Sequence, residues 1–298
     1  MADVSAIVVT HDAAEWIERS LGSLQGTGAE VIVVDNASTD GTPALVRERF
    51  PETRVIEQDN LGFGAGNNAG MRAGSGRYFL LLNPDAWLTE GALAALVAFA
   101  DEHPEAGVVG PRLLNPDGSL QRSVRGYPSP WRIATEYFFL RKLGPRTHAL
   151  NAFFGEQFDH ESVREAEYLF GACLLVRREA VDSVGGFDED FFLMSEEVDW
   201  CYRFRQAGWK VLFYPGAEVV HVVGASLNPR QFHAIVRGHL QFLRKHRGER
   251  EAERARLVML WGLRLRGLVF RGERGRAYRE SAKWLGSGKT AALLESGR

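Results

Sequence analysis

Four short apolar runs, rich in β-branched residues, recur at close intervals in the first part of the chain. They occupy residues 5–10, 31–34, 54–57 and 78–82. Segments with helical periodicity separate them; one spans 42–50, and an earlier one has an apolar side made of Trp16, Ile17, Leu21 and Leu24. Short apolar strands that alternate with helices are typical of a mainly parallel sheet covered on both faces. We therefore expect an α/β fold with such a sheet flanked by helices.

Polar side chains follow each of these runs. The four segments are Thr10-His11-Asp12, Asp35 to Gly41, Asp59 to Gly64, and Asn83-Pro84-Asp85. Ligands of parallel sheets bind beyond the carboxyl ends of the strands. Each segment also has a structural interpretation, since Asp40 with Gly41 makes a turn and Ser38 or Thr39 can cap a helix. Their coincidence at four strand ends favours a site for a polar ligand.

Asn83-Pro84-Asp85 directly follows a strongly apolar strand. A carboxylate there can meet a hard divalent cation whose other ligands are phosphate oxygens, and Pro84 fixes its own φ, which helps to aim the side chain. The tripeptide recurs as Asn115-Pro116-Asp117, but Gly118 follows this copy and no apolar strand precedes it. We interpret the second copy as a β-turn, so only Asp85 is a predicted metal ligand.

The segment from Gly64 to Ala69 fits the G-x-G-x-x-A pattern of dinucleotide-binding folds. In those folds the glycine loop follows the first strand, whereas here it follows the third. The glycines are equally useful for packing a helix close to a sheet, and this is the interpretation we favour.

The stretch from Gly185 to Trp200 combines aromatic residues with an acidic helix start. Ser195 can cap a helix that runs to about residue 207 and stops at Gly208. Its first turn, where the helix dipole favours negative charge, holds Glu196, Glu197 and Asp199. These acids either face a ligand beside the aromatic segment or only stabilise the start of the helix. In the second case Asp199 pairs with Arg203 at i,i+4 spacing.

A histidine interrupts the apolar run from Val219 to Val223. A lone histidine in such a run is more often a buried, hydrogen-bonded core residue than a ligand. A neutral imidazole nitrogen can also bind a metal ion. The pattern alone leaves both interpretations of His221 open.

Charge is divided unevenly along the chain. Residues 1–228 carry 19 basic and 32 acidic side chains, whereas residues 229–298 carry 17 basic and 6 acidic ones. We therefore expect an α/β domain over 1–228 and a basic amphipathic helical extension over 229–298. Helical apolar stripes in this extension are formed by Phe232, Ile235, Val236, Phe242 and Leu243, and by Leu257, Leu260, Trp261, Leu265 and Leu268.

Two interpretations of the basic extension remain open. Its helices either lie on an anionic lipid surface or pack on their own domain with a solvated basic face. The stretch from Leu257 to Phe270 is shorter than the ~20 residues of a spanning helix and contains two arginines, so no transmembrane span is expected.

Only two cysteines, Cys173 and Cys201, occur among the 298 residues. They are too few for a disulfide framework, and a chain of this length buries enough surface without covalent staples. Polar residues interrupt the N-terminal apolar run, so no secretory signal is expected. We expect a cytoplasmic protein.

In their order along the chain, these segments resemble the motifs of the family 2 glycosyltransferases. The matching segments are 8–12, 34–42, 60–68, 82–85, 171–173 and 186–200, and the resemblance covers about residues 4–226. Residues 117–123 with Pro128 look like the bacterial rhamnosyltransferase branch. The resemblance implies a GT-A fold, which is a single nucleotide-sugar-binding α/β domain.

The resemblance also implies roles for individual residues. Asp35 would bond the pyrimidine of the donor, and the nucleotide would further contact Thr10, Asp12, Asn36, Asn60, Asn67 and Asn83. Asp85 and His221 would hold Mg²⁺ or Mn²⁺ against the diphosphate, with Asn83 standing where the family usually has the first acid of Asp-x-Asp. Glu197 aligns with the catalytic base, which is usually an aspartate, and Glu196 and Asp199 are the alternative bases.

These roles imply an inverting glycosyltransferase. It would move a sugar, rhamnose by the branch resemblance, from a dTDP- or UDP-type donor to a hydroxyl of a glycan or polyprenyl-linked acceptor, for cell-surface polysaccharide assembly. Such transfer needs one carboxylate to take the acceptor proton while a cation stabilises the departing diphosphate. A lipid-linked acceptor would give residues 229–298 a role in peripheral contact with the inner face of the membrane; no nucleic-acid partner is expected.

Two other functions compete with this expectation. A nucleotidyltransferase would have a similar sheet and a similar carboxylate that binds a metal ion. It would also need a glycine-rich loop with a basic residue after the first strand, where this chain has His11-Asp12-Ala13-Ala14. A non-catalytic nucleotide-sugar-binding protein is the second alternative. It would not need the usual aspartate at the base position, where this chain has Glu197.

Overall fold

The computed structural model describes residues 3–144, 147–151, 153, 155, 158–222 and 229–295. The chain forms two compact units. One, here called the sheet unit, comprises residues 1–124, 160–192 and 196–223, and the other, the helical unit, comprises 125–159, 193–195 and 224–298.

This division corrects the expected boundary at residue 228. Residues 125–159 belong with the C-terminal helices because their aromatic side chains pack there. The Tyr127 ring stacks on Phe242 with 5.6 Å between centroids, and Arg266 donates to the carbonyl oxygens of Glu136 and Tyr137. Periodicity within one segment gives no sign of such long-range contacts.

The sheet unit is built on one large mixed sheet with the order β3-β2-β1-β4-β11-β6-β12-β5. Its strands are β1 (Val4–Thr10), β2 (Glu30–Asn36), β3 (Arg54–Gln58), β4 (Tyr78–Leu82), β5 (Ala86–Leu88), β6 (Ala106–Leu114), β11 (Cys173–Arg177) and β12 (Lys210–His221). The first four strands are mutually parallel, and β11 is antiparallel to both β4 and β6. The shorter strands are β7 (Leu120–Gln121), β8 (Val124–Arg125), β9 (Arg164–Glu165) and β10 (Tyr168–Leu169).

The predicted strands and mainly parallel sheet are confirmed. Residues 211–214 and 219–221 belong to one long strand, β12. A register shift between Tyr214 and Glu218 interrupts its pairing with β6. Such an irregularity bends a strand without ending it.

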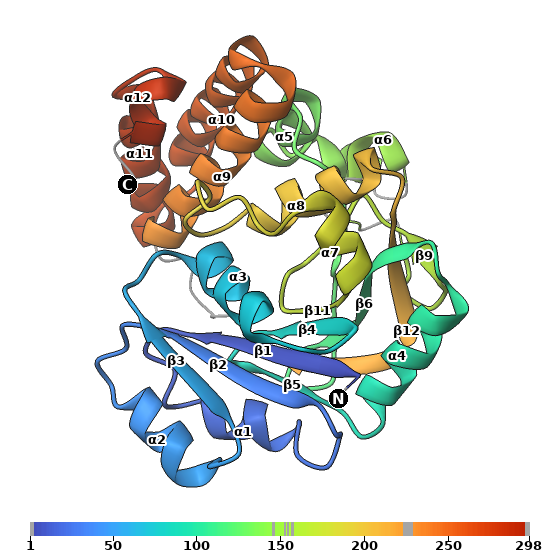
Figure 1. The fold of residues 1–298 in the computed structure, drawn as a ribbon. Helices are drawn as coiled ribbons and strands as arrows, with labels where there is room; N and C mark the ends of the chain where they lie inside the picture. Colours follow the sequence, from blue (N-terminus) through green and yellow to red (C-terminus); the bar gives the residue numbers. More distant parts are fainter. Residues whose placement is uncertain are drawn as a thin grey trace. The chain divides into compact units, whose positions relative to one another are not determined.

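Helices cover both faces of the parallel strands, as Figure 1 shows. On one face lie α1 (Ile17–Gly22), α2 (Thr42–Arg49) and α4 (Ala92–Glu102), whose apolar residues join Ala6 and Val8 of β1 in the core. On the other lies α3 (Phe63–Ala73), against Ile7 and Val9. Since side chains alternate along a strand, β1 is buried throughout because both of its faces are covered. The unit also contains α7 (Arg178–Val184) and α8 (Glu196–Gln206).

The glycines of α3 pack this helix against β1. A Cβ atom at Gly66 would lie 2.7 Å from Cγ1 of Val9, and one at Gly70 would overlap the Ile7 side chain. Gly64 similarly faces the Phe187 side chain. The packing interpretation of the G-x-G-x-x-A segment is therefore confirmed.

We expect Gly70→Ala to lower the free energy of unfolding by about 1–3 kcal/mol, because the added methyl overpacks the contact with Ile7. Gly22→Ala is the matched control, since a Cβ atom there meets nothing within 4 Å. It should leave stability equal or higher, by up to ~1 kcal/mol. Urea denaturation of both variants measures the difference; equal stability of Gly70→Ala and wild type would contradict the packing argument.

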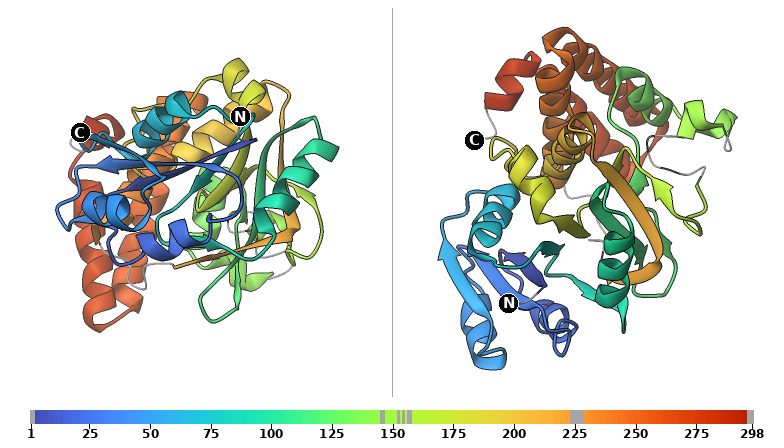
Figure 2. Two further views of the ribbon diagram at one scale, coloured as in Figure 1. Left: turned by 60° about the horizontal axis from the view of Figure 1, so that its bottom comes forward. Right: turned by 45° about the vertical axis from the view of Figure 1, so that its right-hand side comes forward.

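The helical unit comprises α5 (Pro130–Tyr137), the 3₁₀ helix η1 (Leu140–Leu143), α6 (His148–Asn151), α9 (Pro229–Arg247), α10 (Glu249–Val269), α11 (Gly272–Gly286) and α12 (Thr290–Glu295). Helix α10 packs against α5, α9 and α11, and the orange and red helices of Figure 2 show this bundle from two further directions. In α9, Val236, Phe242 and Leu243 are buried as the apolar stripe predicts. None of the helices that the structure describes combines the length and apolar composition needed to cross a membrane.

Candidate functional site

The strand pairing gathers the predicted site residues at one edge of the sheet. Thr10 and Asp35 are paired at the carboxyl ends of β1 and β2, and Leu82 at the end of β4 pairs with Cys173 at the start of antiparallel β11. His221, the last residue of β12, pairs with Ala86 immediately after Asp85. Because adjacent strands lie about 5 Å apart, Asp35 and Asn83 are separated by roughly 10 Å along this edge.

Asp35 is buried and anchors the ends of β1 and β2. One carboxylate oxygen accepts hydrogen bonds from the Thr10 hydroxyl at 2.7 Å and the Ser38 hydroxyl at 2.5 Å, and the other accepts from the Ser38 backbone N–H at 2.9 Å. A carboxylate has about four acceptor sites. These three bonds hold its orientation and leave one acceptor position.

The other predicted nucleotide residues lie at the end of β2, in α3 and on the loops beyond the strands. Asp12 is exposed, has a φ of 52°, and accepts a 2.7 Å bond from the Thr39 N–H. Asn36 is buried and donates to the Gly62 carbonyl. Asn60 is exposed and accepts from the Gly62 N–H, whereas Asn67 is buried and donates within α3 to the Phe63 carbonyl.

Asp85 and His221 are brought together across 136 residues of sequence. Nε2 of His221 lies 3.4 Å from a carboxylate oxygen of Asp85 and 3.5 Å from Nδ2 of Asn83. His221 is 5% exposed. His221 is therefore a buried core residue, as one interpretation of the sequence predicts. It also faces Asp85, the predicted metal ligand, as the interpretation of His221 as a ligand requires.

Gln121 determines which His221 nitrogen faces Asp85. The Gln121 amide nitrogen donates to the His221 carbonyl at 3.2 Å and to the Asn115 side-chain carbonyl at 3.1 Å. Its oxygen therefore accepts from Nδ1–H of His221, at 2.8 Å. The proton on Nδ1 leaves the Nε2 lone pair directed toward Asp85, an arrangement typical of histidines that bind metals.

The donor set fits a divalent cation whose coordination is completed by phosphate. Asp85 supplies a carboxylate and His221 a neutral nitrogen, and the buried side-chain oxygen of Asn83 has no hydrogen-bond partner among the described residues. No group of three or more His, Cys, Asp or Glu side chains suited to a metal occurs in the described part of the chain. Mg²⁺ is commonly held by one or two protein ligands together with substrate phosphates and water, which this smaller set matches.

The three acids of α8 have different surroundings. Glu196 is buried, and one of its oxygens has no hydrogen-bond partner among the described residues; burial, reinforced by the charge of Glu197, raises its pKa well above the usual value. Glu197 is half-buried. Asp199 is fully buried and accepts a 2.8 Å bond from Nε of Arg203, which is the i,i+4 pair named above.

One segment connects the metal candidates to Glu197. The Ala172 carbonyl accepts a 2.9 Å bond from the Asn83 N–H. A Cβ atom on neighbouring Gly171 would lie 3.5 Å from Cγ of Glu197. Asn83 and Glu197 therefore contact the same two-residue segment, just before β11.

The raised pKa of Glu196 predicts a pH-dependent stability. Between the pKa of an unfolded glutamate and this raised value, the folded protein binds more protons, so the free energy of unfolding falls as pH rises. Glu196→Gln removes that proton linkage. We expect urea denaturation to show the variant gaining stability relative to wild type from pH 5 to pH 8; a parallel pH dependence of the two proteins would contradict the burial of an ionisable Glu196.

Two residues that the sequence did not single out hold the aromatic segment before α8. Asn68 of α3 donates to the Phe187 carbonyl at 3.0 Å and accepts from the Phe187 N–H at 2.8 Å. Gly62 has a φ of 97° and lies so close to the Phe192 carbonyl that no Cβ atom fits. Gln121 was missed in the same way, because a partner 100 residues away leaves no local pattern.

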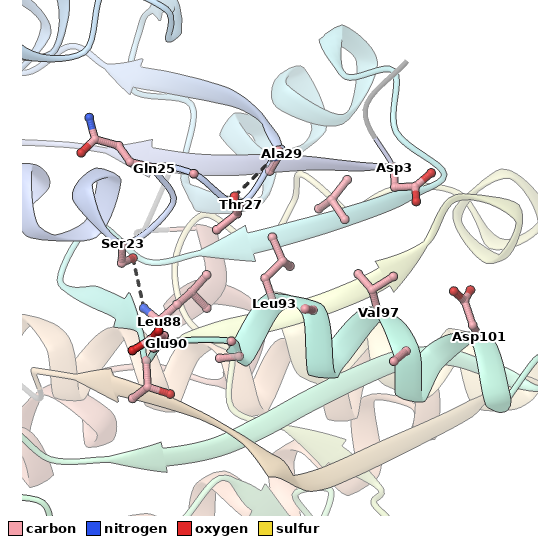
Figure 3. Close-up of a pocket in the computed structure, with 18 of the residues that line it drawn as sticks. Asp3, Ser23, Gln25, Thr27, Ala29, Leu88, Glu90, Leu93, Val97 and Asp101 are labelled. Carbon is pink, nitrogen blue, oxygen red and sulfur yellow. Dashed lines mark hydrogen bonds between the residues drawn. The ribbon is translucent and has the colours of Figure 1, made fainter.

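The cavity shown in Figure 3 lies at the opposite ends of the strands. It has a volume of about 800 Å³, and its lining includes Asp3, Ala29, Arg77 and Asp101, near the amino ends of β1, β2 and β4. Arg77 pairs with both Asp3 and Asp101, and this cation lowers the pKa of Asp101 to about 2. Arg77 offsets only part of the charge of the acids that line it, and none of the predicted site residues lines it.

Comparison with known proteins gives a family match and several relatives. The model described as glycosyl transferase family 2 matches residues 5–185. The N-acetylglucosaminyl-diphospho-decaprenol L-rhamnosyltransferase of Mycobacterium tuberculosis is 37% identical over 237 residues, which are 74% of this chain and 76% of the relative.

Solved structures share the fold at lower identity. The mannosyltransferase PcManGT from Pyrobaculum calidifontis, determined with GDP-Man and Mn²⁺, matches with a TM-score of 0.57 and 18% identity over 99% of this chain and 79% of its own. S. aureus TarS matches with a TM-score of 0.52 and 17% identity over 87% of this chain and 42% of its own. At these identities the likeness shows the fold alone.

Proposed function

Because the chain belongs to family 2 of the glycosyltransferases and has their GT-A fold, we propose that it transfers a sugar with inversion at the edge formed by Asp35, Asp85, Glu197 and His221. The observation that carries this proposal is the contact of Asp85 with His221, together with the segment Gly171–Ala172 that adjoins both Asn83 and Glu197. The metal candidates and the base candidate thus lie near one another.

The residues divide the chemistry between them. Asp35 and its partners Thr10 and Ser38 form the base-binding end of the nucleotide site, and Asn36, Asn60, Asn67 and Asp12 shape the loops around it. Asp85 and His221, with Asn83, would hold Mg²⁺ or Mn²⁺; such an ion neutralises charge that develops on the departing diphosphate. Gln121 keeps the His221 ring in the required orientation.

Glu197 is the proposed general base. It accepts the proton of the acceptor hydroxyl as that oxygen attacks the sugar carbon on the face opposite the leaving diphosphate. Burial raises the pKa of Glu196, which favours its protonated form, and we therefore assign the role of base to Glu197 instead. Asp199, held by Arg203, stabilises the start of α8 instead.

The relatives support a narrower substrate proposal. The mycobacterial relative is named as a rhamnosyltransferase acting on a decaprenyl-diphosphate-linked N-acetylglucosamine. We infer a dTDP- or UDP-type donor carrying rhamnose or another hexose, and a polyprenyl-linked or glycan acceptor for cell-surface polysaccharide. Residues 229–298 would contact the inner face of the membrane, where such acceptors reside.

A panel of nucleoside diphosphates and their sugars, with and without Mn²⁺, tests this function. Thermal shift should rank a pyrimidine nucleoside diphosphate sugar above purine counterparts, more strongly with Mn²⁺. The preferred donor should then be hydrolysed slowly by the enzyme or consumed with an acceptor. Binding without any turnover would favour a non-catalytic nucleotide-sugar-binding protein, and release of pyrophosphate from a nucleoside triphosphate would favour a nucleotidyltransferase.

A further inference from the structure

Helix α10 has two apolar faces, of which only one is used inside the helical unit. Its buried residues are Ala252, Ala255, Arg256, Met259, Leu260, Gly262, Leu263 and Gly267. Gly262 lies directly against the Tyr137 ring of α5. A helix in a water-soluble bundle normally presents a polar surface opposite its buried stripe.

The opposite surface of α10 is apolar instead. Leu257 is 40% exposed, Trp261 57%, Leu265 37% and Leu268 83%. These four residues, here called the outer stripe, follow one another at three- or four-residue spacing and so share one face of the helix. Of the apolar residues of α10 named from the sequence, only Leu260 is buried, so the outer stripe is not the face that packs within the helical unit.

Arginines border the outer stripe. Arg250 and Arg264 are exposed at positions that share its face, and Arg271 is exposed just beyond the end of the helix. The Arg264 guanidinium lies over the Trp261 ring, 4.7 Å from its centroid. Two acids of the same helix, Glu251 and Glu253, are ion-paired with Arg254 and Arg256, so the face presents leucine, tryptophan and positive charge.

We infer that the outer stripe of α10 docks in the plane of an anionic lipid surface. Apolar side chains would enter the boundary between headgroups and acyl chains while arginines contact lipid phosphates, as in interfacial amphipathic helices. This inference deepens the proposed function, in which the acceptor is lipid-linked, by assigning the membrane contact to named residues.

Charge argues for lipid and against a second copy of this chain. If two outer stripes were laid together, the arginines of both copies would gather around one apolar seam, while Glu251 and Glu253 of α10 are already ion-paired within each copy. Like charges so placed are destabilising. Anionic headgroups supply the missing negative charge, at about 1 kcal/mol or less per basic residue near the surface. The 21 residues of α10 span roughly 32 Å, but the helix is not apolar enough to cross a membrane, so we place it along the surface.

The chain offers a matched pair of leucines for the test. Leu268 of the outer stripe is 83% exposed, and Leu143 at the end of η1, also in the helical unit, is 81% exposed. Full-length wild type, Leu268→Asp and Leu143→Asp would be sedimented with vesicles of phosphatidylcholine containing phosphatidylglycerol, without donor or acceptor. We expect Leu268→Asp to lower partitioning at least about tenfold, since it replaces an inserted leucine by a charge, and Leu143→Asp to stay within about twofold of wild type.

Further measurements separate this inference from its rivals. Arg264→Glu should weaken binding to anionic vesicles and not to pure phosphatidylcholine. Equal partitioning of the two leucine variants would overturn the inference, as would a dimer, detected by light scattering, that only Leu268→Asp dissociates. Transfer to a water-soluble acceptor analogue without vesicles should be unaffected by Leu268→Asp, so failure of the lipid contact and failure of the transferase assignment are distinguishable.

Discussion

Glu197→Gln is expected to lower kcat for sugar transfer by about a hundredfold to ten-thousandfold, the range attributed to a positioned general base. The amide keeps the size of the side chain but cannot accept the hydroxyl proton. Affinity for the nucleoside diphosphate should change little, because Glu197 acts on the acceptor side. Initial rates with the preferred donor, together with isothermal titration of the nucleotide, measure both quantities.

Glu196→Gln is the discriminating variant for this result. If Glu196 is held protonated by burial, glutamine reproduces its neutral form, and the loss of kcat should be far smaller than for Glu197→Gln. The reverse order would move the catalytic role to Glu196. Thermal unfolding of both variants checks that neither loss reflects a disturbed α8.

Asp85→Asn is expected to reduce transfer and also to weaken Mn²⁺-dependent nucleotide binding by at least about 10- to 100-fold. Loss of an outer-shell partner of a metal site already costs that much, and Asp85 is a proposed direct ligand. The effect should disappear in EDTA, where wild type and variant bind the nucleotide equally. Titration calorimetry in the presence of Mn²⁺ and of EDTA measures this difference.

The chain contains its own control for Asp85. Asp117 occupies the same position in the second Asn-Pro-Asp tripeptide, which forms the turn after β6 with a 2.9 Å bond from the Gly118 N–H to the Asn115 carbonyl. Gly118 has a φ of 81° there, as a turn of this kind allows. Asp117→Asn should leave Mn²⁺-dependent binding unchanged. Equal losses in the two variants would mean that Asp85 has no special relation to the metal.

The strands and their polar ends were predictable because the pattern is local. A strand buried on both faces is a continuous apolar run, and β4 therefore has the bounds expected for it. The position of the site at the carboxyl ends of the strands was predictable because ligands of parallel sheets generally bind there. One premise that separated Asp85 from Asp117 was wrong, because the buried strand β6 ends at Leu114, immediately before the second tripeptide. Gly118 was the signal that correctly marked the second copy as a turn.

Other features depend on contacts that no local pattern encodes. The bond from His221 to Gln121 requires the register of β12 against β6 and of β6 against β7, which a single sequence leaves open. The sequence also left open which face of α10 is buried, because a helix with apolar residues on two faces gives no sign of which face packs. The grouping of residues 125–159 with the C-terminal helices rests on aromatic contacts such as Tyr127 with Phe242.

The central claim is that Asp85 and His221 bind one cation together with the donor diphosphate at the carboxyl ends of the strands. Anomalous diffraction at the manganese edge, from crystals grown with Mn²⁺ and a pyrimidine nucleoside diphosphate, measures this directly. The account predicts one strong peak about 2–2.3 Å from the Asp85 carboxylate and from Nε2 of His221, with the base of the nucleotide beside Asp35. A peak among Asp3, Arg77 and Asp101 at the opposite ends of the strands, or a bound nucleotide with no peak near Asp85, would contradict it.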